Sequence, residues 1–208
     1  MAAGGALSEQ CQRLIAVLRQ QCPDVLVSVP LAAGTPAPAP VPVNADAAQQ
    51  LVSTAALAAC GLMLESGTAT GDSVVWTQGD HELLVLVAHV RVQLGQGVIA
   101  VTIPVQCDQA GTAEVSVSFV VGDDKRPAGL FAATEHRPRG PDVVVDVWGD
   151  ALTAFAWQLV LDVAAGIAGH AGADADGAGL VPAALAATPD GLSVLPQARH
   201  PFDRVVRL

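Results

Sequence analysis

Residues 82–122 read ELLVLVAHVRVQLGQGVIAVTIPVQCDQAGTAEVSVSFVVG and decide the fold class of this chain. In residues 113–121 every odd position is apolar, and three of the four positions between them are polar (Glu114, Ser116 and Ser118). Successive side chains of a β-strand point to opposite faces, so this alternation is typical of a sheet with one dry face and one mostly wet face.

More strands are predicted around this one. A long strand over residues 82–94 leads to a turn at Gly95-Gln96, where a leading glycine suits a type II′ hairpin. A strand over 97–106 follows, in which Pro104 marks an edge or a bulge. Short strands are predicted at residues 24–29 and 192–195, and others at residues 73–77, 130–135 and 143–147. The last of these has the first turns of the following helix as its alternative.

Two helices are predicted to cover this sheet. Asn44 can cap a helix over residues 46–65. A helix from Gly149-Asp150 to residue 169 is apolar nearly all round, which predicts burial on most sides. Asp162 lies within it, so burial could raise the pKa of this carboxyl. A strip facing solvent or a partner is the simpler interpretation of Asp162.

A third helix is predicted near the N-terminus, over residues 8–22. Its apolar residues form one narrow stripe, and polar residues fill the other face. Such a stripe fits a helix that lies on a sheet or pairs with its copy in a second subunit. The residues predicted to form this interface are Leu7, Cys11, Leu14, Ile15 and Leu18.

These elements predict an α+β fold in which an antiparallel β-meander of five to six strands packs against two or three helices. Prolines at positions 36, 38, 40 and 42 indicate an extended linker that cannot pair in a sheet. The predicted parts are an N-terminal helix and short strand (1–29), a Pro/Ala-rich linker (30–45), an α+β core domain (46–169), and a Gly/Ala-rich linker with a C-terminal arm (170–208).

Composition excludes several classes of partner. The chain has 208 residues and a formal net charge of −10, and no basic cluster offsets this charge, so nucleic acid and anionic membrane surfaces are not expected partners. The start of the sequence lacks the features of a signal peptide. The four cysteines are dispersed, which is typical of small apolar residues in a reducing compartment. We therefore expect a cytoplasmic protein of a GC-rich bacterium.

The sequence offers no recognisable catalytic constellation. It has no nucleotide-binding glycine motif, no nucleophile elbow and no spacing that suits zinc, so no catalytic residue, metal or cofactor is predicted. If a ligand pocket exists, Trp76, His89 and Arg91 are expected to line it, because they come from neighbouring strands.

Two functions from different classes fit these patterns. The first is a non-catalytic interaction, adaptor or scaffold domain that self-associates through its helices or a sheet edge. A chaperone-like role is included in this class. The order helix, strand, helix, three strands resembles roadblock-type dimerisation domains, and the small acidic chain resembles secretion chaperones. These likenesses rest on topology and composition, without a shared motif.

The alternative is an acyl- or metabolite-binding protein, or an enzyme that resembles the hot-dog thioesterases. In that comparison residues 46–65 form the wrapped helix. The resemblance implies a carboxylate or amide poised in the site, and within positions 47–64 only Gln49 and Gln50 carry such a group.

Overall fold

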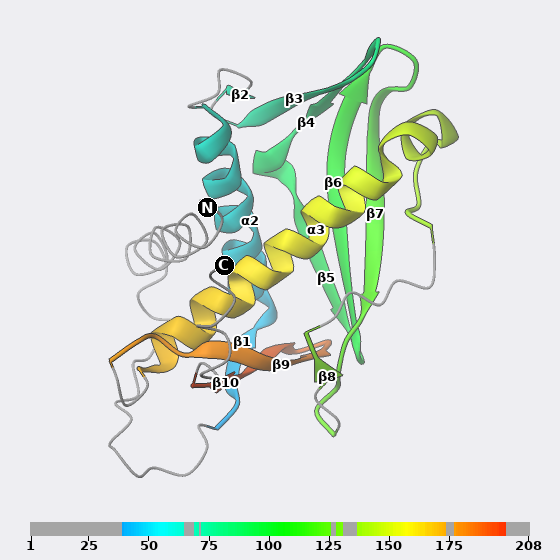
Figure 1. Ribbon diagram of the computed structural model, residues 1–208. Coiled ribbons are helices and arrows are strands. Elements are labelled where there is room, and N and C mark those ends of the chain that lie inside the picture. The colour runs from blue at the N-terminus through cyan, green and yellow to red at the C-terminus, as the bar shows by residue number, and fades with distance from the viewer. Residues whose placement is uncertain are drawn as a thin grey trace, which may run out of the picture.

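The computed structural model describes residues 39–64, 69–70, 72–125, 128–130, 137–173 and 177–198. These residues form two antiparallel sheets and two long helices (Figure 1). We call the six-stranded sheet the central sheet and the four-stranded sheet the end sheet. The predicted fold class, an α+β fold with an antiparallel sheet packed on helices, is confirmed.

Helix α2 spans Ala45–Leu64 and helix α3 spans Asp142–Ala171. The central sheet contains β2 (Ala69–Thr70), β3 (Ser73–Gln78), β4 (His81–Val85), β5 (Arg91–Gly95), β6 (Val98–Cys107) and β7 (Gly111–Val120). The end sheet contains β1 (Val41–Asn44), β8 (Ala128–Gly129), β9 (Val181–Thr188) and β10 (Gly191–Gln197).

The dry face of the central sheet is the one that the sequence predicted. On β7, Val115, Val117 and Phe119 are fully or almost fully buried, whereas Glu114 and Ser118 are exposed. β6 pairs with β7 along its whole length and buries its own odd positions on the same face. α3 crosses this face and continues to the end sheet (Figure 1).

The predicted strand over residues 82–94 is wrong in one respect, because a 3-10 turn (η1, Val87–His89) divides it into β4 and β5. Pro104 on β6 explains the break. Leu86 donates its N–H to the Pro104 carbonyl, but Pro104 has no N–H to return to the Leu86 carbonyl. That carbonyl accepts a hydrogen bond from His89 instead, which closes the turn. The irregularity expected at Pro104 therefore appears in the facing strand.

The hairpin between β5 and β6 lies one residue later than predicted. Gly95 belongs to β5 and pairs with Val98, so Gln96 and Gly97 form the turn. Gly97 adopts a φ of 68°, a conformation that favours glycine. Its N–H also donates to the Ala187 carbonyl, and its carbonyl accepts the Val121 N–H, which joins the two sheets.

Residues 143–147 are helical rather than a strand, and the last helix begins at Asp142 instead of Gly149. Val144, Val145 and Trp148 point into the core at helical spacing, while Asp142 and Asp146 are exposed. Burial of one helical face overrides the strand preference of consecutive valines. The alternative that the sequence left open is therefore the observed one.

Helix α3 is the core helix of the fold. By length and composition, it is the one helix in the described part of the chain that could cross a membrane, and half of its apolar window is buried inside the protein. It contacts α2, the strands β6 and β7 of the central sheet, and the strands β9 and β10 of the end sheet. Its apolar character is therefore explained by packing on several neighbours.

The prediction that the alternating prolines prevent sheet pairing is wrong for β1. Val41 and Val43 pair with β10, whereas Pro42 lies between them at a position that makes no ladder hydrogen bond with β10. This register follows from the bond between the Ala45 N–H and the Asp190 carbonyl. A proline at every second position places the missing donors on one edge, so the other edge remains free to pair.

The region after α3 belongs to the fold. The predicted short strand at 192–195 lies within β10, whereas β9 was missed because its sequence, VPAALAAT, lacks alternation. β10 pairs with β1 and β9, so parts of the predicted linker and of the predicted arm together form the end sheet. The predicted N-terminal helix, the short strand of residues 24–29 and nearly all of the predicted strand at 130–135 lie outside the described residues.

Candidate functional site

Trp76 lies on the buried face of the central sheet, under α3. It pairs in register with Leu83, which is fully buried. Its ring contacts Phe155 edge-on with 5.6 Å between ring centroids, and it contacts Trp148 at 6.3 Å. These contacts give Trp76 a packing role: it holds α3 against β3.

Arg91 lies on the opposite face of the central sheet. Its neighbour Val92 pairs with the buried Val101, so Arg91 points to the outer face, where its guanidinium forms an ion pair with Glu114 at 2.6 Å. Both side chains are more than half exposed, so this pair contributes little stability. His89 is exposed and lies in the 3-10 turn rather than on a strand.

The structure therefore does not bring Trp76, His89 and Arg91 together. Trp76 is under a helix, Arg91 is on the outer face of the sheet, and none of the three lines either hollow described below. Their role in ligand binding stays a prediction.

Gln49 on α2 has a structural role, because it hydrogen-bonds the backbone next to β5. Its amide nitrogen donates to the Val90 carbonyl (3.0 Å) and to Ser53 Oγ (2.8 Å), and its amide oxygen accepts the Val92 N–H (2.7 Å). It therefore satisfies the backbone where β5 begins, just after the interruption of the strand. The sequence singled out this amide only as a possible catalytic group, because the partner backbone is more than 40 residues away.

Three carboxylates on α3 have partners within the helix or just before it. Arg137 forms ion pairs with Asp146 and Asp142 across the first turns of the helix. Gln158 donates a hydrogen bond to Asp162 at 2.7 Å. Burial raises the pKa of Asp162 above its ordinary value, and the bond from Gln158 opposes this effect. The sequence offered this rise only as the alternative to a strip that faces solvent or a partner.

A small hollow of about 90 Å³ lies where the β3–β4 and β6–β7 turns meet α3. It is lined by Asp80, His81, Glu82, Cys107, Asp108, Gln109, Val143, Val147 and Trp148. Within the described ranges, no group of three or more His, Cys, Asp or Glu side chains is placed to hold a metal ion. The hollow is also too small for most metabolites.

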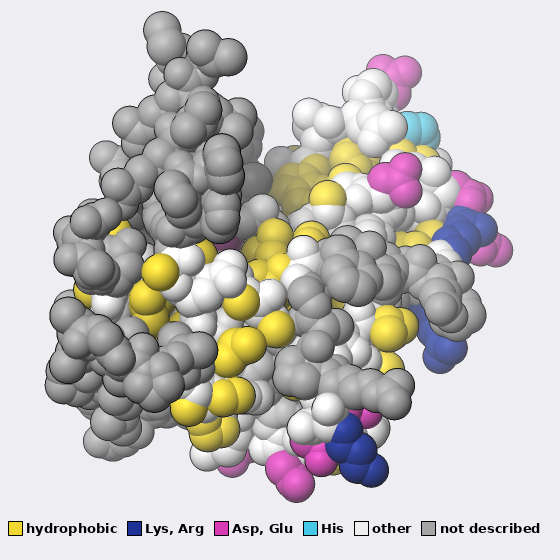
Figure 2. All heavy atoms as spheres, turned by 60° about the horizontal axis from the view of Figure 1, so that its bottom comes forward, with side chains coloured by type: hydrophobic (Ala, Val, Ile, Leu, Met, Phe, Trp, Pro, Cys, Tyr) yellow, Lys and Arg dark blue, Asp and Glu magenta, His cyan; other side chains and the backbone are white. Residues whose placement is uncertain are grey.

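A larger hollow of about 590 Å³ lies on the outer face of the end sheet, and we call it the acidic hollow. The β9–β10 hairpin and β1 form most of its surface, and the loop after β7 forms one wall. Its lining residues are Pro40, Pro42, Val43, Asn44, Asp123, Asp124, Ala186, Thr188, Asp190, Gly191, Leu192, Ser193 and Leu195. Figure 2 shows apolar side chains gathered on this face, with acidic side chains at its border.

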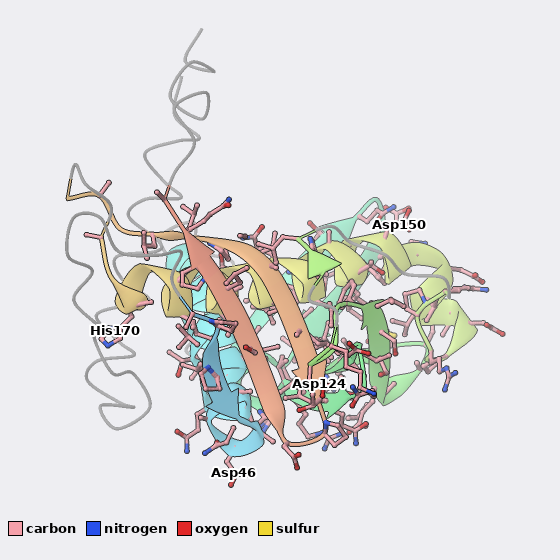
Figure 3. The ribbon with its side chains drawn as sticks, turned by 90° about the horizontal axis from the view of Figure 1, so that it is seen from below. Asp46, Asp124, Asp150 and His170 are labelled. Carbon is pink, nitrogen blue, oxygen red and sulfur yellow. The ribbon has the colours of Figure 1, made fainter. Side chains whose placement is uncertain are left out.

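The position of the loop that carries two of the aspartates is set by backbone pairing. Gly122 forms a parallel bridge with Ala186, so the loop after β7 runs along β9. The Asp123 carboxylate accepts the Lys125 N–H (2.9 Å), and the Asp124 carboxylate accepts a bond from the Gln96 amide (2.7 Å). Figure 3 shows Asp124 beside the hairpin end of β9 and β10.

Asp190 completes the acidic border from the β9–β10 turn, where its carbonyl also accepts the first N–H of α2. The hollow thus combines an apolar floor with three carboxylates, which suits a ligand that has an apolar body and positive charge. Local sequence does not show that these aspartates lie close together, because their proximity depends on the bridge between Gly122 and Ala186. No protein-family model, curated protein or solved structure matches this chain.

Proposed function

We propose that this chain is a non-catalytic protein-interaction domain, an adaptor or scaffold that self-associates. The observation that carries the proposal is the use of its polar side chains. Gln49 holds the backbone of β5, Arg91 pairs with Glu114, and Gln158 pairs with Asp162. In the described residues these groups support local structure. Catalysis would instead require such groups to converge in a cleft.

The end sheet argues for self-association through the predicted N-terminal stripe instead of the β1 edge. Pro42 places its nitrogen, which carries no hydrogen, on the free edge of β1, and Pro40 precedes it at the same two-residue spacing. An edge with missing donors resists extension by a second strand. The narrow apolar stripe of Leu7, Cys11, Leu14, Ile15 and Leu18 is a better candidate interface.

Light scattering during size-exclusion chromatography tests this proposal. The full chain is expected to elute as a dimer or larger assembly at micromolar concentration, and Leu14→Asp is expected to convert it to a monomer. Gln12→Asp, which adds the same charge on the predicted polar face, is the matched control and keeps the assembly. A wild-type monomer at 100 µM, or assembly that survives Leu14→Asp together with Leu18→Asp, contradicts the proposal.

We further propose that the protein works in the cytoplasm without crossing a membrane. The packing of α3 on both sheets supports this proposal, because half of its apolar window is buried inside the protein and is not available to lipid. The dispersed cysteines also suit a reducing compartment. Fractionation of native cells with an antibody to the chain tests it, and recovery in the membrane pellet after a high-salt wash contradicts it.

A second candidate function is small-molecule binding in the acidic hollow. Its volume of about 590 Å³ lies within the range of metabolite pockets, and its floor is apolar. A thermal-shift screen with acyl-CoAs, polyamines and hydrophobic amines tests this candidate. The candidate is supported if a compound raises the Tm of the wild type but not of Ser193→Trp, whose indole fills the floor. A screen in which no compound shifts the Tm contradicts it.

A further inference from the structure

We propose that the acidic hollow is a peptide-binding site, and that its occupant is the basic segment of residues 199–208 from the same copy of the chain. These residues lie outside the described part of the structure. The inference concerns a different surface from the self-association proposed above, so either proposal can fail alone.

Charge complementarity is the first argument. The chain carries ten basic residues against twenty acidic ones, yet Arg199, Arg204 and Arg207 fall within ten positions that contain a single acid, Asp203. The border of the hollow carries three carboxylates. Arginine forms directional hydrogen bonds with carboxylates, and the attraction also lowers the self-repulsion of an acidic protein.

The apolar content of the segment is the second argument. Phe202, Val205 and Val206 alternate with or flank the arginines. The floor of the hollow presents the exposed Pro40 and Pro42 and the half-buried Leu195, which an extended segment can cover. Apolar contact and charge contact are therefore both matched between the two surfaces.

Reach is the third argument. The described chain continues only one residue beyond β10, which lines the hollow with Gly191, Ser193 and Leu195. β10 has seven residues and spans about 20 Å, and the seven residues after His200-Pro201 span up to about 23 Å when they are extended. The segment can therefore turn at His200-Pro201 and return to the aspartates, and a short tether gives a high effective concentration.

Zero-length cross-linking locates the segment. Lys125 is the single lysine of the chain, so Lys125→Arg removes the native lysine amine, and Arg207→Lys or Arg204→Lys then introduces one in the segment. A carbodiimide is expected to join this amine to Asp123, Asp124 or Asp190. Gln109→Lys in the same background is the matched control, because Gln109 lies beside Asp108 and Glu82 at the other hollow.

The origin of each cross-link is read by mass spectrometry on a mixture of ¹⁴N- and ¹⁵N-labelled chains. Cross-links within one isotope support the proposal. Cross-links between isotopes assign the hollow to a second copy and overturn it. Exclusive cross-linking to acids elsewhere, such as Asp142 or Asp146, overturns it as well, as does an introduced lysine that reacts with no carboxylate while the control does.

A charge swap tests whether electrostatics holds the segment. Asp124→Arg and Arg207→Asp should each raise the equilibrium constant of unfolding. In the double variant this constant should be about two- to five-fold lower than the two single effects together predict. Gln96→Ala controls for the loss of the bond between Gln96 and Asp124. The restoration should shrink at 0.5 M salt. The same cycle is run with Arg204→Asp in place of Arg207→Asp. If the effects on unfolding are additive in both cycles, the proposal is overturned.

Discussion

Replacement of Gly191 by alanine is the most direct test of how the end sheet is joined to the rest of the fold. A Cβ atom at Gly191 would lie 2.1 Å from the Val43 carbonyl oxygen and 3.0 Å from the Asn44 Cα. Both atoms are backbone, so no flexible side chain can move away. To reach a separation of 3.0 Å, β1 and β10 must move apart by at least 0.9 Å (3.0 − 2.1).

The energetic cost follows from this displacement. Overpacking of a tight site costs about 1–3 kcal/mol. The same movement stretches the 3.0 Å bond from the Ala45 N–H to the Asp190 carbonyl, and a lost hydrogen bond costs about 1 kcal/mol more. The expected destabilisation is about 2–4 kcal/mol. For a chain of this size it corresponds to a fall in Tm of roughly 4–16 °C.

Thermal unfolding followed by circular dichroism, with hydrogen exchange of β1 and the start of α2, measures the effect. Gly95→Ala is the matched control: it also lies in a strand, and its Cβ would meet Val98 atoms at an ordinary 3.9 Å. We expect this control to stay within about 0.5 kcal/mol of the wild type. A Gly191→Ala Tm within 2 °C of the wild type, with unchanged exchange in β1, would refute the close approach of β1 to β10. An equal loss in Gly95→Ala would show a general effect of glycine replacement in strands.

Three other perturbations test the packing and the polar contacts. Gln49→Leu should destabilise the protein by about 2–3 kcal/mol, because it leaves two partly buried backbone groups without partners. Gln93→Ala on the exposed face should be neutral in urea unfolding, and equal stability of the two variants counts against this role of Gln49. Trp76→Ala should cost about 2–4 kcal/mol of stability and loosen α3, because it removes the contacts with Trp148 and Phe155. Val75→Ala, one residue away on the outer face, should cost under about 1 kcal/mol. An unchanged near-ultraviolet circular dichroism spectrum of Trp76→Ala contradicts this packing role. Because burial raises the folded-state pKa of Asp162 above 3.8, its ionisation costs stability as pH rises through that folded-state value. Asp162→Asn should therefore melt higher than the wild type at pH 7, with a gap that closes below pH 3.8, and a gap that is the same at both pH values contradicts the raised pKa.

Local patterns were sufficient wherever one face of an element decides its structure. The alternation at residues 113–121 predicted both β7 and the face that it buries. The Asn44 cap was also readable, and the structure confirms it through the bond from the Ala47 N–H to Asn44 Oδ1 at 2.8 Å. These features depend on residues within a few positions of each other, so sequence neighbours carry the information.

Contacts between distant segments escaped prediction. The break after β4 depends on Pro104, which meets Leu86 only when β6 pairs with β4. The strand pattern around Trp76 does not show that α3 lies over this side chain, because α3 begins 66 positions later. A strand pattern alone shows which side chains share a face, but it does not show what covers that face.

The sequence by itself determined the class of the protein: a strongly acidic α+β chain with an antiparallel sheet, dry on one side, and a helix too apolar to be exposed. Tertiary structure alone decided that the alternating prolines pair along one edge, that the alanine-rich β9 completes a second sheet, and that Asp123, Asp124 and Asp190 border one hollow. The physical reason is that hydrophobic alternation is a property of neighbours along the chain. A hollow is a property of backbones that hydrogen bonds bring together from positions more than 60 residues apart.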